Sequence, residues 1–346
     1  MTSITAPADP RLAALDNWLA GVLRTRAFTL APASADASFR RYFRVTLAER
    51  SPLAPDAKTF VVMDAPPPQE NCRPFVHVAA LLTAAGVNAP HIHAQDLERG
   101  FLLLTDLGST TYLHALDEHN ADALFADAMD TLVRWQLATR PGVLPPYDTA
   151  LLRRELMLFP EWYVAWHRGI DLTDAERTSL LAVFERIIAA NLAQPSVFVH
   201  RDYMPRNLML TAPNPGVLDF QDAVIGPITY DVASLYKDAF LSWPEERVLD
   251  WTIRYWERAR RAHLPVATDF ADFWRDFEWM GLQRHLKVLG IFARICHRDG
   301  KPAYVEDTPR FLAYVRPVAQ RYDELAPLIP LLDRIEQHTP AVGYTF

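Results

Sequence analysis

The chain has 346 residues, and at about 150 residues per domain this length predicts two domains or lobes. Half of the residues are hydrophobic and 22% are charged, a balance that is typical of a globular protein and excludes wholesale disorder. The 42 acidic residues exceed the 35 basic ones and give a net charge of -7. General nucleic-acid binding is therefore disfavoured, because such a surface repels phosphate backbones.

Cysteine usage and the lack of long apolar segments indicate where the protein works. The two cysteines, Cys72 and Cys296, are too few for a disulfide framework or a four-thiolate metal site. No run of about 18 apolar residues predicts a membrane-spanning helix, and the N-terminal residues lack the basic and apolar parts of a signal peptide. We expect a cytoplasmic protein with no nucleic-acid or membrane partner, and nothing in the sequence indicates an obligate protein partner.

Short β-prone runs alternate with turns before about residue 110. The pattern predicts strands at 39–47, 59–63, 92–94 and 101–104. The last of these is apolar on both faces, which is typical of a buried central strand. A helix is predicted over 74–85, where apolar residues follow helical spacing and Gly86 is the stop signal.

The rest of the chain is predicted to be mostly helical. Helices are expected over 121–138, 151–167 and 174–193, and again from residue 228 nearly to the end. A short strand at 197–199 and a hairpin of 208–210 with 217–218 interrupt them. The sequence therefore predicts an α+β, two-lobed fold, with a small β-rich N-lobe (1–106) and a large, mainly α-helical C-lobe (107–346).

One polar segment carries the candidate chemistry. It runs from His200 to Asn207 between two short strands and contains Asp202, and Asp219 follows Asn207 by twelve residues. Carboxylate and amide oxygens suit a hard cation such as Mg²⁺. If Asn207 and Asp219 hold the metal, Asp202 remains as a carboxylate that can accept a proton from an attacking hydroxyl. The competing interpretation is that these side chains only cap turns.

These residues carry a resemblance. His-x-Asp-x-x-x-x-Asn, followed by an apolar-Asp-Phe element, resembles the catalytic loop and metal-binding segment of the protein-kinase-like fold. Its form is closer to aminoglycoside phosphotransferases and choline kinases than to protein kinases. The stretches HRDYMPRNLM, GVLDFQDAVIGPITYDVASLYKDAF, FVVMDAPP and LLLTDLG further resemble bacterial anomeric sugar kinases of cell-wall recycling. That resemblance implies transfer of phosphate from ATP, with Mg²⁺, to the C1 hydroxyl of N-acetylmuramate or N-acetylglucosamine.

The resemblance also implies a nucleotide site in the N-lobe. The hinge residues Thr105, Asp106 and Leu107 are expected to hold the adenine through their backbone. The turn over 34–41 has no glycine, and the strand over 59–64 has no lysine, although the family's wider pattern has both. The nucleotide phosphates are therefore expected to meet Ser38 and the cations that lie nearest in the chain, which are Arg40, Arg41 and Arg44.

The sugar is expected to bind in the C-lobe beside Asp202. Arg206 is a candidate cation for the transferring phosphate or an acidic sugar, or it is a solvent-facing loop residue. Glu155 is predicted to accept sugar hydroxyls and Tyr163 to stack on a pyranose ring, the alternative being that their helix face packs in the core.

Two other residues have structural interpretations, and two other functions stay open. The His200 ring is expected to hydrogen-bond the loop backbone, and Asp231 to anchor the loop through backbone N–H groups. An aminoglycoside or amino-alcohol (choline-type) kinase is one alternative function, and it would need a strongly acidic acceptor pocket. A catalytically inactive nucleotide-binding regulator is the other, suggested by the missing lysine and glycines, although Asp202, Asn207 and Asp219 argue against it.

Overall fold

The computed structural model describes residues 9–34, 39–50, 52–55, 57–67 and 69–337, which belong to two compact units. The first unit comprises Met1–Thr110 and Met209–Asp222, and the second comprises Thr111–Leu208 and Ala223–Phe346. The short segment Met209–Asp222 therefore groups with the first unit, although the sequence-based division at residue 106 placed it with the C-lobe. We describe each unit by itself.

An antiparallel sheet forms the centre of the first unit. Its strands have the order β1-β2-β3-β5-β4, and they are β1 (Phe28–Ser34), β2 (Arg41–Leu47), β3 (Thr59–Asp64), β4 (Ile92–Asp96) and β5 (Phe101–Thr105). Each neighbouring pair runs antiparallel, with Arg41 opposite Asp64 and Val61 opposite Leu104. Leu102 and Leu103 of β5 are fully buried, which confirms the predicted buried strand.

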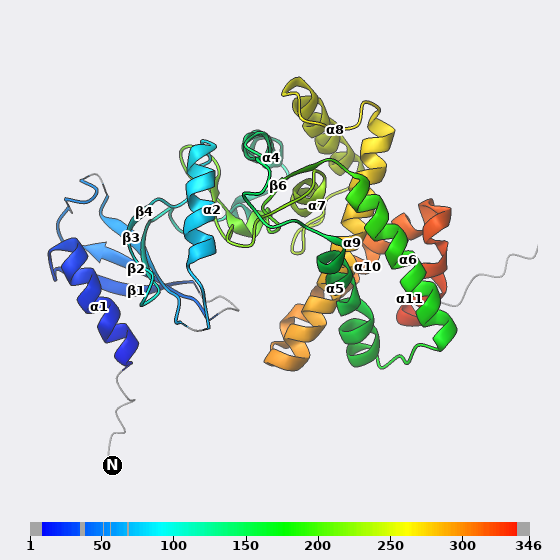
Figure 1. Ribbon diagram of the computed structural model, residues 1–346, viewed down its shortest axis with the longest axis horizontal. Coiled ribbons are helices and arrows are strands. Elements are labelled where there is room, and N and C mark those ends of the chain that lie inside the picture. The colour runs from blue at the N-terminus through cyan, green and yellow to red at the C-terminus, as the bar shows by residue number, and fades with distance from the viewer. Residues whose placement is uncertain (1–8, 35–38, 51, 56, 68, 338–346) are drawn as a thin grey trace, which may run out of the picture. The chain divides into compact units, whose positions relative to one another are not determined.

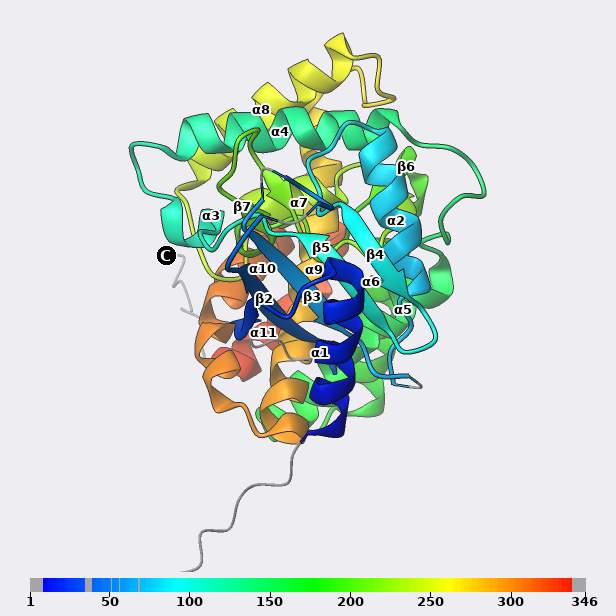
Figure 2. The same cartoon turned by 90° about the vertical axis from the view of Figure 1, so that its left-hand side faces the viewer.

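A helix that the sequence analysis did not predict covers one face of this sheet. Helix α1 (Pro10–Leu23) begins after Asp9, whose side chain accepts hydrogen bonds from two backbone N–H groups, and proline occupies the first helical position. Figures 1 and 2 show α1 lying across the sheet. Its buried leucines share one core with apolar side chains of β2, β3 and β5, a cluster formed by Leu15, Leu19, Leu23, Val45, Leu47, Phe60, Val62, Phe101 and Leu103.

The predicted hairpin is confirmed, and hydrogen bonds join it to Asn88 of the first unit. Strand β8 (Gly216–Val217) pairs with β7 (Leu208–Met209). Asn88 follows helix α2 (Arg73–Ala84); its carbonyl accepts from the Val217 N–H at 2.7 Å and its side chain donates to Thr211 at 3.1 Å. At Gly216 a Cβ atom would lie 2.9 Å from the end of the Leu107 side chain, so the hairpin packs closely on the hinge there and a larger residue would make Leu107 shift.

Helices dominate the second unit, as predicted. They are α3 (Tyr112–Ala115), α4 (Ala121–Leu137), α5 (Thr149–Leu158), the π-helix η1 (Phe159–His167), α6 (Asp174–Ala193), the short 3₁₀-helix η2 (Pro205–Asn207), α7 (Tyr230–Tyr236), α8 (Glu245–Arg261), α9 (Phe270–Asp299), η3 (Pro302–Asp307), α10 (Thr308–Arg321), η4 (Asp323–Leu328) and α11 (Ile329–Glu336). Helix α9 is buried along most of its middle, and α5, α6, η1, α7 and α10 all pack against it. Figure 1 shows α9 between these helices. Within the described ranges, no helix combines the length and apolarity needed to cross a bilayer.

The segment predicted as one helix over 151–167 changes its hydrogen-bonding pattern part of the way along. Helix α5 ends at Leu158, and η1 continues as a π-helix. Pro160 has no N–H for the carbonyl four residues earlier, so the α-helical ladder cannot continue through it. Gly290 of α9 closes against this junction, where a Cβ atom would lie 2.3 Å from the backbone carbon of Leu158.

A two-stranded ladder supports the loop that carries the candidate chemistry. Strand β6 (Ser196–Val199) pairs antiparallel with β9 (Val224–Pro227). The sequence analysis predicted β6 but not β9, because the only apolar residues of this four-residue strand are two branched ones followed by Gly226 and Pro227. Val197, Phe198 and Val199 are buried, so β6 gives the following loop a rigid start.

The contact of α9 with the end of α5 can be tested with two glycine substitutions in α9. Gly290→Ala should lower the free energy of unfolding by about 1–3 kcal/mol, because the new methyl group overlaps backbone atoms of Leu158. Gly281→Ala should be neutral or stabilise by about 0.5–1 kcal/mol, because its nearest neighbour lies at 3.6 Å and alanine is the better helix former. Urea titrations of both variants test this, and equal effects would contradict the packing at Leu158.

Candidate active site

The 200–207 loop leaves the buried strand β6 and is tied down by helix α7. Both Asp231 carboxylate oxygens accept backbone hydrogen bonds from this loop, from the N–H of His200 at 2.7 Å and of Arg201 at 3.0 Å. Asp231 is fully buried, and burial raises its pKa to about 7 while the two N–H donors oppose that shift. The predicted anchoring role of Asp231 is confirmed.

Hydrogen bonds within the loop then fix the backbone around Asp202. The Asp202 N–H donates to Nδ1 of the His200 ring at 3.2 Å, which confirms the predicted role of that histidine. The Asp202 carbonyl accepts from the Met204 N–H at 3.0 Å and from the Asn207 side-chain nitrogen at 2.9 Å. The structure therefore brings Asp202 and Asn207 together. With the Asn207 nitrogen on this carbonyl, its side-chain oxygen is the atom that could bind a metal.

The neighbours of Asp202 and Asn207 attach the loop to helix α4 and to the stretch between α7 and α8. The fully buried Tyr203 donates its hydroxyl to the Ala128 carbonyl of α4 at 2.8 Å. The Arg206 guanidinium lies 5.5 Å from the centre of the Phe240 ring, at the distance of a cation–π contact. Arg206 is half-buried rather than fully exposed.

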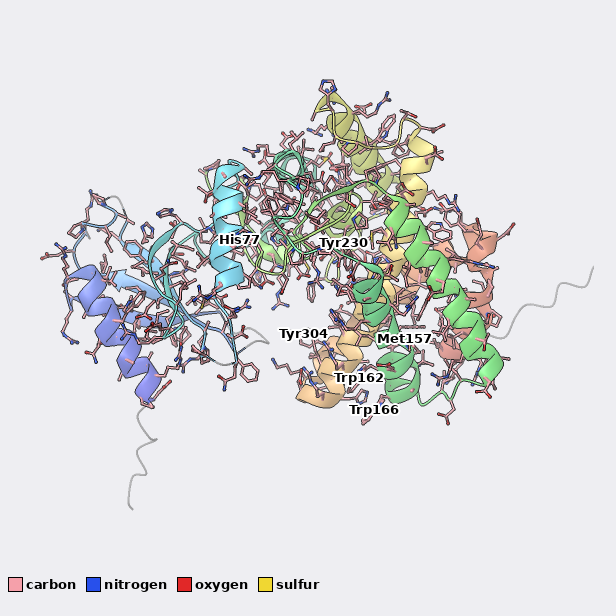
Figure 3. All side chains as sticks on the ribbon, in the orientation of Figure 1. His77, Met157, Trp162, Trp166, Tyr230 and Tyr304 are labelled. Atoms are coloured by element: carbon pink, nitrogen blue, oxygen red, sulfur yellow. The ribbon has the colours of Figure 1, made fainter. Side chains whose placement is uncertain are left out.

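The other two predicted sugar residues lie deeper than the loop. Glu155 is 5% exposed and forms ion pairs with Arg201 at 2.6 Å and Lys287 at 3.1 Å. Tyr163 is 1% exposed, and its ring stacks between Phe159 and His167. On the same π-helix, Trp162 and the exposed Trp166 lie with their ring centres 5.4 Å apart (Figure 3).

Two cations near Asp202 were missed by the sequence analysis. Arg284 and Lys287 of α9 are buried and are electrostatic neighbours of Asp202, as is Arg201. Arg284 lies over the ring of Tyr230, 5.0 Å from its centre, and Lys287 donates to the Tyr230 hydroxyl at 3.0 Å. Figure 3 labels Tyr230 in this interior. Basic residues inside an apolar helical run, as in MGLQRHLKVLG, were the signal available in the sequence.

The Asp219 segment belongs to the first unit. Asp219 has a φ of +61°, its carboxylate accepts from the Gln221 side chain at 2.8 Å, and it is half-buried. Phe220 is fully buried against Phe75 of α2, with ring centres 4.6 Å apart. The segment is therefore held beside α2 by an apolar contact, while Asp222 is exposed.

The arginines of the first unit have different partners. Arg41 pairs with Asp64 at 2.5 Å and also with Asp9, and Arg44 pairs with Asp106 at 2.7 Å. Arg40 pairs with Glu70 at 3.0 Å, and Asp222 and Asp219 are further electrostatic neighbours that raise the pKa of Arg40 against the lowering effect of burial. Asp219 is thus among the electrostatic neighbours of Arg40.

The predicted hinge is ordered by its own side chains. Thr105 contacts the His93 ring at 3.0 Å, and Asp106 accepts from Arg44 and from the Gly108 N–H at 2.9 Å. Ser38, also predicted at the nucleotide site, lies outside the described residues. Among the residues that are described, no group of three or more His, Cys, Asp or Glu side chains forms a metal cluster. Asn207 belongs to the second unit and Asp219 to the first, and their assignment as Mg²⁺ ligands stays a prediction from the sequence.

The comparisons with known proteins agree with the loop chemistry. Residues 29–268 match the model of the family described as "Phosphotransferase enzyme family". The chain belongs to this family. It is 55% identical over 328 residues to an N-acetylmuramate/N-acetylglucosamine kinase of Pseudomonas putida, covering 93% of this chain and 94% of that one. A protein of the same name from Pseudomonas aeruginosa is 57% identical over 312 residues, 90% of each chain.

A solved structure supports the fold of this phosphotransferase. The choline kinase of Cryptosporidium parvum superposes with a TM-score of 0.61, covering 93% of this chain and 99% of that one, at 12% sequence identity. This likeness confirms the predicted α+β, protein-kinase-like fold, with a five-stranded antiparallel sheet near the N-terminus and mainly helices after it.

Substitutions of two buried carboxylates can separate the effect of Asp231 on catalysis from its effect on the stability of the fold. Asp231→Asn should lower the melting temperature and reduce kcat by at least about 10-fold, because an amide nitrogen would face a loop N–H that has lost its acceptor. Asp238→Asn is the control, since Asp238 accepts from the N–H groups of Phe240 and Leu241, outside the loop. It should lower the melting temperature with a much smaller effect on kcat. Equal losses of kcat would contradict the anchoring role.

Proposed function

We propose that the protein is an ATP-dependent kinase that phosphorylates the anomeric C1 hydroxyl of N-acetylmuramate, N-acetylglucosamine or both, in peptidoglycan recycling. The observation that carries this proposal is the similarity, over nearly the whole chain, to kinases named for these two sugars. The ordered 200–207 loop supports it, because Asp202 has the surroundings that a positioned proton acceptor needs. A reaction that uses ATP and a recovered sugar fits the cytoplasm.

Asp202 is the proposed catalytic base. Its carboxylate orients the C1 hydroxyl and takes its proton as the oxygen attacks the terminal phosphorus of ATP, whose bond to the bridging oxygen breaks and releases ADP. An anomeric hydroxyl is more acidic than other sugar hydroxyls because the ring oxygen withdraws charge from C1, so a single carboxylate can serve. Asn207 and Asp219 are the proposed ligands of Mg²⁺, on the basis of their sequence spacing and donor atoms. When bound, Mg²⁺ offsets charge on the phosphates.

Arg40 is the proposed substitute for the lysine that strand β3 lacks. Arg41 and Arg44 are engaged by the carboxylates of Asp64 and Asp106, whereas the surroundings of Arg40 include Asp219, a proposed Mg²⁺ ligand. Glu70 limits the motion of its guanidinium through the ion pair at 3.0 Å. Ser38 and Arg41 are weaker candidates for binding the ATP phosphates. The adenine is proposed to bind to the backbone of Thr105, Asp106 and Leu107.

The charges around Asp202 bear on the choice of acceptor. Arg201, Arg284 and Lys287 are electrostatic neighbours of Asp202 within the second unit. Glu155 pairs with Arg201 and Lys287, so this group of charges is not the strongly acidic one that an amino alcohol or aminoglycoside would need. Arg206 remains a proposed contact of the sugar or the transferred phosphate. Tyr163 stays a prediction whose depth in the core favours packing over stacking on a pyranose.

A substrate panel with product analysis tests this function. ATP consumption should be highest with N-acetylmuramate or N-acetylglucosamine and near background with choline, ethanolamine and aminoglycosides. The phosphorus atom of the product should couple to H1 in an NMR spectrum, and the 1-O-methyl glycoside should not react because its C1 oxygen is blocked. Coupling to the H6 protons, or turnover of the methyl glycoside, would contradict an anomeric kinase. Turnover of the amines alone would contradict a sugar kinase.

A further inference from the structure

Glu155 occupies the centre of a buried cluster in the second unit. Its Oε1 atom accepts from Arg201 at 2.6 Å and pairs with Lys287 at 3.1 Å. Its Oε2 atom accepts from Gln283 at 3.1 Å and from the Tyr147 hydroxyl. We call these five residues the Glu155 cluster. They come from four segments of the chain: the stretch before α5, α5 itself, the 200–207 loop and α9.

Four donors use the acceptor capacity of one carboxylate. An ionised carboxylate offers about four lone-pair sites, so the cluster saturates Glu155 and leaves no ready acceptor for a sugar hydroxyl. The group stays charged: burial raises its pKa, but the attraction of Lys287 and Arg201 outweighs burial and lowers the pKa of Glu155 to about 2. Glu155 is thus built to hold neighbouring cations in place.

The cation that it holds nearest the reaction is Arg201, the residue immediately before Asp202. Arg201 has a φ of +78°, in the left-handed region that a residue with a side chain rarely adopts. Such a conformation persists only where the surroundings determine it from several sides. Here Asp231 binds the backbone N–H of Arg201, and Glu155 binds its guanidinium. Together these contacts fix both ends of the residue.

We propose that Glu155, with Lys287 beside it, is a positioning residue that holds Arg201 in its left-handed conformation and so sets the place of the Asp202 carboxylate. This inference rests on the proposed function only in taking Asp202 as the base. Lys287 pairs with the same Glu155 oxygen, Oε1, that accepts from Arg201, and it also donates to the Tyr230 hydroxyl. Lys287 therefore helps to hold the Glu155 carboxylate in the orientation that faces Arg201. Loss of the contact would let Arg201 relax toward negative φ and so move the Asp202 carboxylate away from the acceptor hydroxyl.

Steady-state kinetics of two single variants and their combination test the proposal. Glu155→Gln and Arg201→Gln should each lower kcat about 10- to 100-fold, because a small displacement of a reacting group has effects of this size. The KM values for ATP and sugar should stay within about 2-fold. The double variant should fall no further than the lower single variant, because both changes remove the same contact.

Glu185→Gln is the matched control. Glu185 on α6 pairs with Arg153 on α5 at 2.7 Å, but both side chains are exposed, and this variant should keep wild-type kcat. Urea titration of every variant separates a positioning role from a structural one, since kcat is then compared only where each protein is fully folded. If Glu155→Gln does not fold, Arg201→Gln alone decides, because its side chain is 19% exposed and more tolerant of change.

The outcomes are distinct. A lower kcat with steady KM values and a non-additive double variant supports the proposal. An unchanged kcat in folded Arg201→Gln or Glu155→Gln overturns it, and so do multiplied losses in the double variant. A large rise in the KM for sugar at constant kcat would instead return Glu155 to direct sugar binding. Failure of the proposed function would show as a wild-type protein inactive on every sugar, which these variants cannot mimic.

Discussion

The Asp231 carboxylate accepts two consecutive backbone N–H groups of the 200–207 loop, and the order of that loop depends on this contact. A buried carboxylate is costly unless donors satisfy it, so the contact is stable only because the N–H groups are presented by the rigid end of β6. In the loop that this contact anchors, Arg201 has a positive φ, and the His200 ring and Asn207 close around the backbone of Asp202. The Asp231 side chain thus holds the loop that carries the proposed catalytic base.

Buried charge shapes the rest of the second unit. Three carboxylates interact electrostatically there with three cations. The carboxylates are Glu155, Asp202 and Asp231, and the cations are Arg201, Arg284 and Lys287. Removing one member of such a group leaves an uncompensated buried charge, which costs far more than an exposed ion pair would contribute.

The sequence predicted what local pattern and short spacing determine. The strands β2, β3, β5 and β6 and the helices α4 and α6 follow from nearby residues. The Asp231 anchor lies 30 residues from Arg201 and was predicted from the resemblance to kinases. Helix α1 was missed although Asp9 and Pro10 mark its start. The π-helix after Leu158 was missed although Pro160 interrupts the α-helical hydrogen bonds there, and the close packing of Gly290 on Leu158 joins residues far apart in the chain.

The parts of the candidate site that the sequence did not predict depend on contacts between residues far apart in the chain. Glu155 faces Gln283 and Lys287, which are about 130 residues away, and no periodicity in α5 reveals that it is saturated. The pairing of Arg41 with Asp64 depends on strand register, and that of Arg44 with Asp106 on contacts between separate elements. Spacing could nominate all three arginines as phosphate-binding cations, but only the structure gives each its partner.

The most direct test of this account is the comparison of Asp202→Asn with wild type. The change keeps size and polarity but removes proton acceptance, so kcat should fall about 10²-fold or more while ATP binding, followed by calorimetry, stays nearly unchanged. A variant that turns over at close to the wild-type rate would contradict Asp202 as the base, and with it the role assigned here to the whole loop.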